Sequence, residues 1–317
     1  CDVMYITHLY GNYPEMQLKR KASNKFVLEE TKFTNTGTAS LSNDPNTNHG
    51  CPCTCSFYEN RLDRCSSSKY YTYLYGSKGA DYNNITVGTN TNDGFQFDLA
   101  ESNSKALWLI SGANSLLVGT AEGVLTVNGG SVTAAITPED ISAKLSCRDG
   151  CGAVQPVRKD NFVFYVSANG RKLFMFEYDV LLEQFKATNL SKGNYEITKG
   201  GITKIVYKND QFDFMYAVCN GNLLQICFSN DESVNAWSVL KTKGNIQDIC
   251  TVTRPDGNQD LFAKIRREIN GITRYYLELL TDIVEFPRFE NFVSEIPENA
   301  TDVEILNLKK NDEYAFN

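Results

Sequence analysis

The chain of 317 residues carries a formal net charge of −7 and has a sequence pI of about 5.1. A hydrophobic content of 42% and an aromatic content of 12% are typical of a globular protein and exclude a disordered chain. The acidic balance argues against a protein that holds nucleic acid by neutralising its phosphates. The longest apolar runs, such as ALWLI, are far shorter than a membrane-spanning helix, so we expect no membrane insertion.

Strand patterns begin with the first residues of the chain. Residues 2–8, 16–22 and 25–33 alternate apolar and polar side chains and are rich in β-forming residues, which predicts three strands. Because the chain starts at Cys1 inside such a pattern, we expect it to be part of a longer protein. The segment 34–54 is rich in Thr, Asn, Ser and Gly and is predicted to be a loop.

The strand patterns resume after this loop and become very short. SFYENRL (56–62) and YYTYLYG (70–76) each predict a strand. Residues 107–111 and 116–120 predict two more, and a further strand is predicted to begin at Val124. Glycine-containing breaks separate these strands, which indicates an up-and-down arrangement.

Only one segment carries a helix signal. TPEDISAKL (137–145) has a Thr at the capping position, Pro at the first helical position and acidic residues in the first turn. We therefore expect one or two helical turns there, or a loop.

Three hairpins are predicted in the second half of the chain. The first, 161–179, is expected to turn at residues 168–170. The others, 212–229 and 261–280, are expected to turn at Asn-Gly pairs, which are the strongest short signal for a hairpin.

Strand pairs recur at about the spacing of β-propeller blades. A single short sheet of this kind is unstable alone, because its faces and edges stay exposed. We therefore predict an all-β fold, a β-propeller of about six to eight blades with few or no helices. Residues 1–33 would supply the first propeller strands and 34–54 a polar loop. Residues 55–282 would form blades, and 283–317 a closing strand or the lead into a further domain.

Ten cysteines are many for such a chain. Cys51, Cys53, Cys55 and Cys65 cluster, but the C-x-C-x-C spacing is too tight for an ordinary zinc site. Cysteines two apart in a strand share a face and bridge poorly. Free thiols buried in strands are favoured, with a disulfide framework and a metal site as alternatives. The same interpretation covers the cysteines at 219, 227 and 250, which lie in apolar strands.

No catalytic constellation is apparent. The two histidines, His8 and His49, lack the partners of a nucleophile triad, and each is predicted to be a surface or satisfied residue. Residues 90–98 resemble a calcium loop, but the register that puts Gly94 at the sixth position fails, so a turn is predicted. We predict no catalytic, cofactor-binding or metal-binding residues, no cofactor and no enzymatic activity.

Two clusters of basic residues are candidate binding surfaces. Lys264 and Arg266 would share one strand face with Glu268, and the cluster also includes Arg267 and Arg274. A solvated face is favoured for this cluster and for LKRK at 18–21, with an interface to a neighbouring subunit as the alternative. Three N-x-S/T sequons, at Asn84, Asn189 and Asn299, are weak support for secretion.

A series of segments resembles the tail nozzle proteins of short-tailed bacteriophages, also called tail tubular protein B. These segments follow the family's order over nearly the whole chain and comprise residues 2–33, 57–62, 73–88, 93–130, 153–157, 170–179, 234–244 and 265–280. The cysteine-rich stretch departs from the family pattern, and 34–54 stands where relatives carry an inserted domain.

This resemblance implies a structural protein of the virion tail, assembled in the host cytoplasm. It would form a ring with copies of itself, as a hexamer, and would contact the tail adaptor ring and tail fibres. DNA would be transported cargo only.

Two alternatives remain open at this point. One is a secreted or surface carbohydrate-binding β-propeller held partly by disulfides. The other is a propeller hydrolase with central carboxylates. Free thiols would favour intracellular assembly, whereas paired cysteines would favour secretion.

Overall fold

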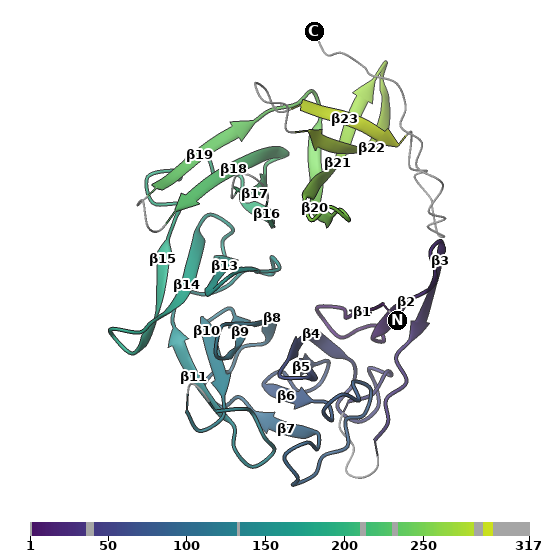
Figure 1. Cartoon of the computed structure of the whole chain (residues 1–317), viewed down its shortest axis with the longest axis vertical. Coiled ribbons are helices and arrows are strands. Elements are labelled where there is room, and N and C mark those ends of the chain that lie inside the picture. The colour runs from purple at the N-terminus through teal and green to yellow at the C-terminus, as the bar shows by residue number, and fades with distance from the viewer. Residues whose placement is uncertain are drawn as a thin grey trace. The chain divides into compact units, whose positions relative to one another are not determined.

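All regular elements in the described part of the chain are β-strands. The computed structural model describes residues 2–35, 41–131, 134–209, 214–229, 234–281 and 288–293. The strands form one three-stranded and five four-stranded sheets, each a local antiparallel meander in which chain neighbours pair (Figure 1). This confirms the predicted all-β propeller class, and the six sheets agree with the predicted number of blades.

The chain divides into two compact units, each described by itself. Unit 1 comprises residues 1–168 and 174–188, and unit 2 comprises 169–173 and 189–317. The strands of unit 1 are β1(Val3–Ile6), β2(Met16–Ala22), β3(Lys25–Glu30), β4(Pro52–Tyr58), β5(Arg61–Ser67), β6(Tyr73–Gly76), β7(Phe95–Asp98), β8(Ala106–Ser111), β9(Leu116–Thr120), β10(Val124–Asn128), β11(Ser142–Cys147), β12(Val157–Lys159), β13(Phe162–Val166), β14(Leu173–Asp179) and β15(Gln184–Asn189), the last two reaching the boundary.

Unit 2 contains two four-stranded sheets. Their strands are β16(Ile202–Lys208), β17(Phe214–Cys219), β18(Asn222–Ser229), β19(Val234–Leu240), β20(Asn245–Thr253), β21(Gln259–Ile269), β22(Ile272–Thr281) and β23(Arg288–Val293). β23 lies inside the segment 283–317 and pairs with β22. Residues 294–317 lie outside the described part of the chain.

The predicted hairpins and their turns are confirmed. β17 and β18 meet at the Asn220–Gly221 turn, and β21 and β22 meet at Asn270–Gly271. Asn220 and Gly221 both have positive φ, 49° and 75°, as the tight hairpin turn requires. β8 to β10 also lie where the short strands were predicted.

Both units bury their sheet faces in apolar cores. In unit 1, Trp108 of β8 is completely buried and lies against Gly119 of β9, where a Cβ atom would come within 1.9 Å of Trp108 Cε2. Only glycine therefore fits beside this indole. Unit 2 has one core cluster, formed by buried residues of β16 to β22 such as Val218, Leu223 and Ile249.

For 137–145 the predicted helical turns are wrong, and the alternative of a loop holds for residues 137–141 only. Thr137 and Asp140 close a turn, and strand β11 follows at once. Ala143 and Leu145 pair with β10 and pack on the core of unit 1, so tertiary burial overrides the local capping signal.

Two strand boundaries also differ from the sequence prediction. β4 begins at Pro52, inside the predicted loop 34–54, and residues 36–40 of that loop lie outside the described part of the chain. The segment 56–62 is a hairpin, because Glu59 and Asn60 adopt positive φ and reverse the chain between β4 and β5.

A buried ion pair joins the first two sheets of unit 1. Arg64 of β5 and Glu15, which precedes β2, both have fully buried side chains. Arg64 donates from Nε to Glu15 Oε2 at 2.7 Å and from Nη2 to Oε1 at 2.8 Å. Its Nη1 donates to the carbonyl of Tyr82 at 3.0 Å, and its guanidinium lies over the ring of Phe33. The bidentate geometry and the carbonyl satisfy the buried charges.

Unit 2 contains a second buried pair of the same type. Arg267 of β21 donates to both carboxylate oxygens of Glu278 on β22, at 2.7 Å each. It also contacts Thr242 and the carbonyl of Lys243 in the loop before β20.

No helix in the described residues could cross a membrane.

Replacement of Glu15 by Gln tests the first ion pair. Because the variant leaves the Arg64 charge buried and unpaired, we expect the free energy of unfolding to fall by about 3–5 kcal/mol. Urea unfolding followed by circular dichroism measures this change. Glu29→Gln, which removes the solvent-exposed partner of Lys19, is the control and should leave the unfolding midpoint almost unchanged. Equal midpoints for the two variants would contradict the assignment.

Candidate functional site

Five side chains of unit 1 form a contiguous surface that we call the tyrosine patch: His8, Tyr10, Tyr13, Tyr71 and Lys105. The ring of His8 meets Tyr13 edge-on at 4.9 Å and Tyr10 at 5.9 Å between centroids. Lys105 Nζ lies 5.0 Å from the Tyr10 ring centroid and 5.9 Å from that of Tyr71. The three tyrosines are 53–64% exposed, which is unusual for a group of large aromatic side chains.

Three loops of unit 1 supply the patch. His8, Tyr10 and Tyr13 lie between β1 and β2, Tyr71 between β5 and β6, and Lys105 immediately before β8. The loops before β6 and β8 come together because β8 packs beside β4 and β5. The β1–β2 loop joins them through the close approach of Gly11 to Cys51 and Ser68.

Gly11 fixes the first of these loops against its neighbours. Its φ is +63°, and its N–H donates to the carbonyl of His8 at 2.7 Å. A Cβ atom here would come within 2.7 Å of the Cys51 carbonyl oxygen and 2.9 Å of Ser68 N. Glycine is therefore required both for the backbone conformation and for the close approach.

The two histidines occupy different environments, both rich in tyrosine. His49 Nδ1 lies 2.8 Å from Tyr75 Oη, and its ring stacks on Tyr70 at 3.9 Å between centroids. Burial, with a smaller contribution from Lys69, lowers the pKa of His49 below its ordinary value. His49 is thus a satisfied histidine, as predicted. His8 Nδ1, in contrast, is buried without a hydrogen-bond partner.

The clustered cysteines do not form a metal site. Cys51, Cys53 and Cys65 are buried, and Cys55 is half-buried. Burial raises the pKa of the Cys51 thiol to about 11 and those of Cys55 and Cys65 to about 12. The described residues contain no group of three or more metal-ligating side chains.

The nine cysteines in the described ranges are all free, but not all are buried. Cys219 is buried and Cys227 half-buried in their strands, as predicted. Cys250 is exposed, and its predicted burial is wrong. A register shift in β20 between Ile246 and Asp248 turns it outward, while Ile246 and Ile249 face the core.

One carboxyl group has an unusual environment but cannot meet a substrate. Asp63 of β5 is 1% exposed, and its Oδ1 lacks a hydrogen-bond partner. Burial raises its pKa to about 8, although Arg61 and Arg64 act in the opposite direction. Arg61 itself donates to the carbonyls of Ser77, Thr91 and Asp93. Because a general acid must touch its substrate, we assign Asp63 a structural role.

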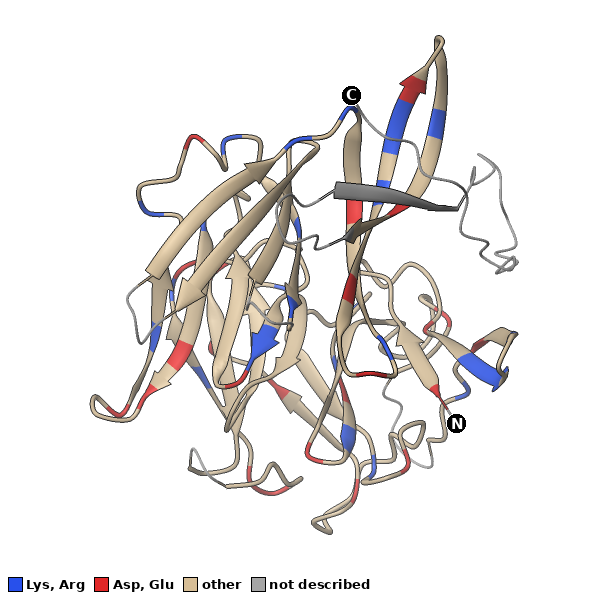
Figure 2. Cartoon of the chain, turned by 45° about the horizontal axis from the view of Figure 1, so that its top comes forward, with Lys and Arg blue, Asp and Glu red and all other residues tan. Residues whose placement is uncertain are grey.

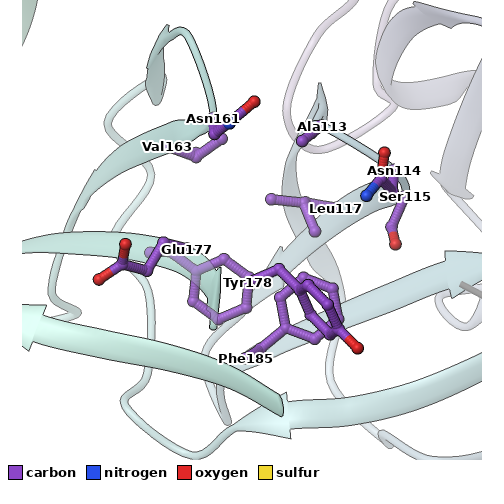
Figure 3. A pocket seen from close by; sticks show the side chains of 11 residues that line it. Ala113, Asn114, Ser115, Leu117, Asn161, Val163, Glu177, Tyr178 and Phe185 are labelled. Atoms are coloured by element: carbon purple, nitrogen blue, oxygen red, sulfur yellow. The ribbon is translucent and has the colours of Figure 1, made fainter. Parts of the chain in front are cut away.

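A pocket beside β14 and β15 is too small to hold a sugar. It lies among Leu117, Val163, Tyr178 and Phe185, with Asn114 at its edge (Figure 3). Tyr178 meets the Phe185 ring edge-on at 5.0 Å between centroids. The enclosed space is about 10 Å³, which corresponds to about one water molecule.

The basic cluster lies on the β21–β22 hairpin at the top of Figure 2. Lys264, Arg266 and Glu268 are exposed on one face, which confirms the predicted solvated face. Arg267, in contrast, is buried in its pair with Glu278.

The remaining sequence motifs form local contacts. Asp93 accepts hydrogen bonds from the backbone N and side chain of Asn90, which confirms a turn in place of a calcium loop. Asn84 caps the backbone N–H of Thr86, and Asn189 donates to Tyr195 Oη. The sequon at Asn299 lies outside the described residues.

Sequence reasoning missed the tyrosine patch. The segment 70–76 was predicted to be a strand because of its alternating tyrosines, but β6 begins only at Tyr73. Tyr70 and Tyr71 therefore lie in the turn before it, where their rings are exposed. A signal was present in the aromatic residues beside turn-forming residues in HLYGNY and KYYTY.

Comparisons with known proteins identify the fold alone. No family model matches the chain, and no curated protein matches its sequence. The solved structure of a candidate 6-phosphogluconolactonase from Bacteroides uniformis is similar, with a TM-score of 0.55 and 11% identity over 93% of this chain and 81% of that chain. A candidate 6-phosphogluconolactonase from Bacteroides fragilis has a TM-score of 0.50 and 10% identity, over 92% and 83% of the two chains.

The extracellular domain of a hybrid two-component system from Bacteroides thetaiotaomicron is also similar. Its TM-score is 0.50 and its identity 11%, over 92% of this chain but only 35% of that one.

These findings overturn the resemblance to phage tail nozzle proteins and the virion role inferred from it. The similar solved structures are proteins of other kinds, and no family model supports the tail assignment. The segments that carried the resemblance largely coincide with strands and hairpin turns. Since any blade must repeat such strands and turns, their order follows from the propeller fold and does not identify a family.

Asp63→Asn tests the buried carboxyl group. The pKa of Asp63 in the folded chain, about 8, lies above the value of about 4 expected when unfolded. Its contribution to stability is therefore full below pH 4 and is lost as the pH rises from 4 to 8. The stability of Asp63→Asn relative to the original chain should rise by about 1.4 kcal/mol per pH unit in this window. Urea unfolding of both chains at pH 5, 6, 7 and 8 measures this change. A difference in unfolding free energy that does not vary with pH would contradict the raised pKa of Asp63.

Thiol titration tests the state of the cysteines. We expect Cys250 to react first with a thiol reagent at pH 8, because it is the exposed cysteine of the described set. In denaturant without reductant, at least the nine described cysteines should titrate as free thiols. A Cys250→Ser variant should lose the fast phase. A markedly lower total would reveal disulfides and would favour a secreted protein.

Proposed function

We propose that this chain is a carbohydrate-binding β-propeller, and that the tyrosine patch is its binding surface. The observation that carries the proposal is the exposure of Tyr10 and Tyr71, whose rings both lie beside Lys105. The names of the similar structures agree with it, since two are named for phosphogluconolactone. At 10–11% identity that agreement adds little beyond the fold, so the proposal depends on the patch.

Exposed tyrosines suit a sugar for two reasons. The ring face is flat and apolar and can cover the C–H face of a pyranose, while the phenol hydroxyl can hydrogen-bond to a sugar hydroxyl. A tyrosine also has few rotatable bonds, so little conformational entropy is lost when a ligand orders it. His8 contacts Tyr10 and Tyr13, and Lys105 lies beside Tyr10 and Tyr71, so the surface is wider than a single ring.

The backbone beneath the patch is already ordered. The Gly11 turn packs on Cys51 and Ser68, and the nearby Glu15 is fixed by Arg64. A preorganised surface loses less free energy on binding than a mobile loop would.

The proposed function is binding without catalysis. The side chains of the patch can stack, donate and accept hydrogen bonds. In the described part of the chain no carboxylate forms an ion pair with Lys105, and the buried Asp63 has no access to solvent. A lactone or glycoside hydrolysis assay should therefore show no turnover above the rate without protein.

Tyr71→Ala and Tyr10→Ala test the proposal. Soluble neutral and acidic oligosaccharides can be titrated into the chain by calorimetry, and at least one should bind. Loss of one stacked ring should weaken that binding about tenfold, which corresponds to about 1.4 kcal/mol.

Tyr195→Ala is the matched control, because Tyr195 is a similarly exposed tyrosine in unit 2. It should leave the affinity unchanged. Gly11→Ala, which displaces the loop without removing a ring, should weaken binding as well. If no oligosaccharide binds, or if all four variants bind equally well, the proposal is wrong.

A further inference from the structure

Lys105 is an ammonium group without an anionic partner. Its Nζ lies over the ring of Tyr10, 5.0 Å from the centroid, and over that of Tyr71, 5.9 Å from the centroid, near the thiol of Cys53. No ion pair with a carboxylate involves it in the described ranges, and the side chain is half-buried.

Several other basic side chains of unit 1 lie beside carboxylates. Arg64 pairs with Glu15, Lys19 with Glu29, and Lys78 lies 3.9 Å from a carboxylate oxygen of Asp93. The carboxylate of Glu122 is held by the hydroxyls of Ser102 and Ser104, on the loop that precedes Lys105. Glu122 is thus already hydrogen-bonded elsewhere, and in the described ranges Glu101, the acid nearest to Lys105 in the chain, forms no ion pair with it.

This environment favours an incoming anion. The two rings attract the cation through their quadrupoles, but they carry no net charge. They also displace part of the water that would otherwise solvate the ammonium. An ammonium has three N–H donors, and a thiol is a weak acceptor, so donors remain for a stronger one.

From this geometry we propose that the tyrosine patch selects sugars that carry an acidic group, a carboxylate or a phosphate. The sugar ring stacks on Tyr10 or Tyr71, and the anion accepts hydrogen bonds from Lys105 Nζ. This inference rests on the proposed function and adds the charge of the ligand to it. Lys105 is the specificity-determining residue, and the tyrosines provide affinity for any sugar of suitable shape.

The test uses two pairs of ligands that differ only in the acidic group. Digalacturonate is compared with the neutral disaccharide of the same linkage, and glucose 6-phosphate with glucose. Calorimetry at about 20 mM salt should show the acidic member of at least one pair binding tenfold or more tightly. The preference should shrink at about 500 mM salt, because screening weakens a partly exposed charge pair. The pair that shows the larger preference distinguishes carboxylate from phosphate.

Lys105→Gln should abolish the preference for the acidic member of the pair, whereas Lys105→Arg should retain most of it. Lys69→Gln is the matched control, because it removes the same charge from the neighbouring loop, where Lys69 Nζ donates to the carbonyl of Asn46. Lys69→Gln should keep the preference for the acidic sugar over the neutral one. Thermal unfolding confirms that each variant is folded.

Two outcomes separate this inference from the proposed function. If acidic and neutral sugars bind equally, or if Lys105→Gln keeps the preference, the inference is overturned. The proposed function then stands as long as Tyr71→Ala still weakens binding. If neither pair binds at all, both are overturned.

Discussion

The buried pair of Arg64 and Glu15 is the constraint on which the candidate site depends. Glu15 ends the connection between β1 and β2 that carries three side chains of the tyrosine patch. Its carboxylate holds Arg64, its backbone N–H donates to Asn43 Oδ1, and its carbonyl accepts from Thr31 N. Every polar group of this residue is therefore used to join separate segments of unit 1. An exposed ion pair would fix the connection far less firmly.

The protein uses its aromatic side chains in two opposite ways. Trp108, Tyr165 and Phe174 are buried in unit 1, and the last two rings stack at 5.2 Å between centroids. Tyr10 and Tyr71, in contrast, are more than half exposed. Large apolar rings that remain in contact with water forgo about 1.5–3 kcal/mol each of burial free energy. Under the proposed function, a bound sugar would cover these exposed rings.

Turns and short strands were predictable from the sequence because their causes are local. The Asn270–Gly271 turn needs two positive φ angles, 54° and 77°, and only a few residue types adopt them at low cost. Strand β2 was predicted with its observed bounds, since its alternation is regular. The helix signal at 137–145 failed where the core demanded β11. The family resemblance failed because ordered strand and turn patterns are shared by all propellers.

By itself, the sequence determined an all-β chain of repeated short meanders, because hydrophobic alternation and Asn-Gly turns act over a few residues. The tertiary structure alone decided which polar residues became internal. Arg64, Asp63 and Arg267 resemble surface residues in the sequence but lie inside the protein. The tertiary structure also decided which residues make up the tyrosine patch. Tyr10, Tyr71 and Lys105 belong to three loops that are far apart in the chain. They meet only in the folded chain, where β8 packs beside β4 and β5 and Gly11 lies against Cys51 and Ser68.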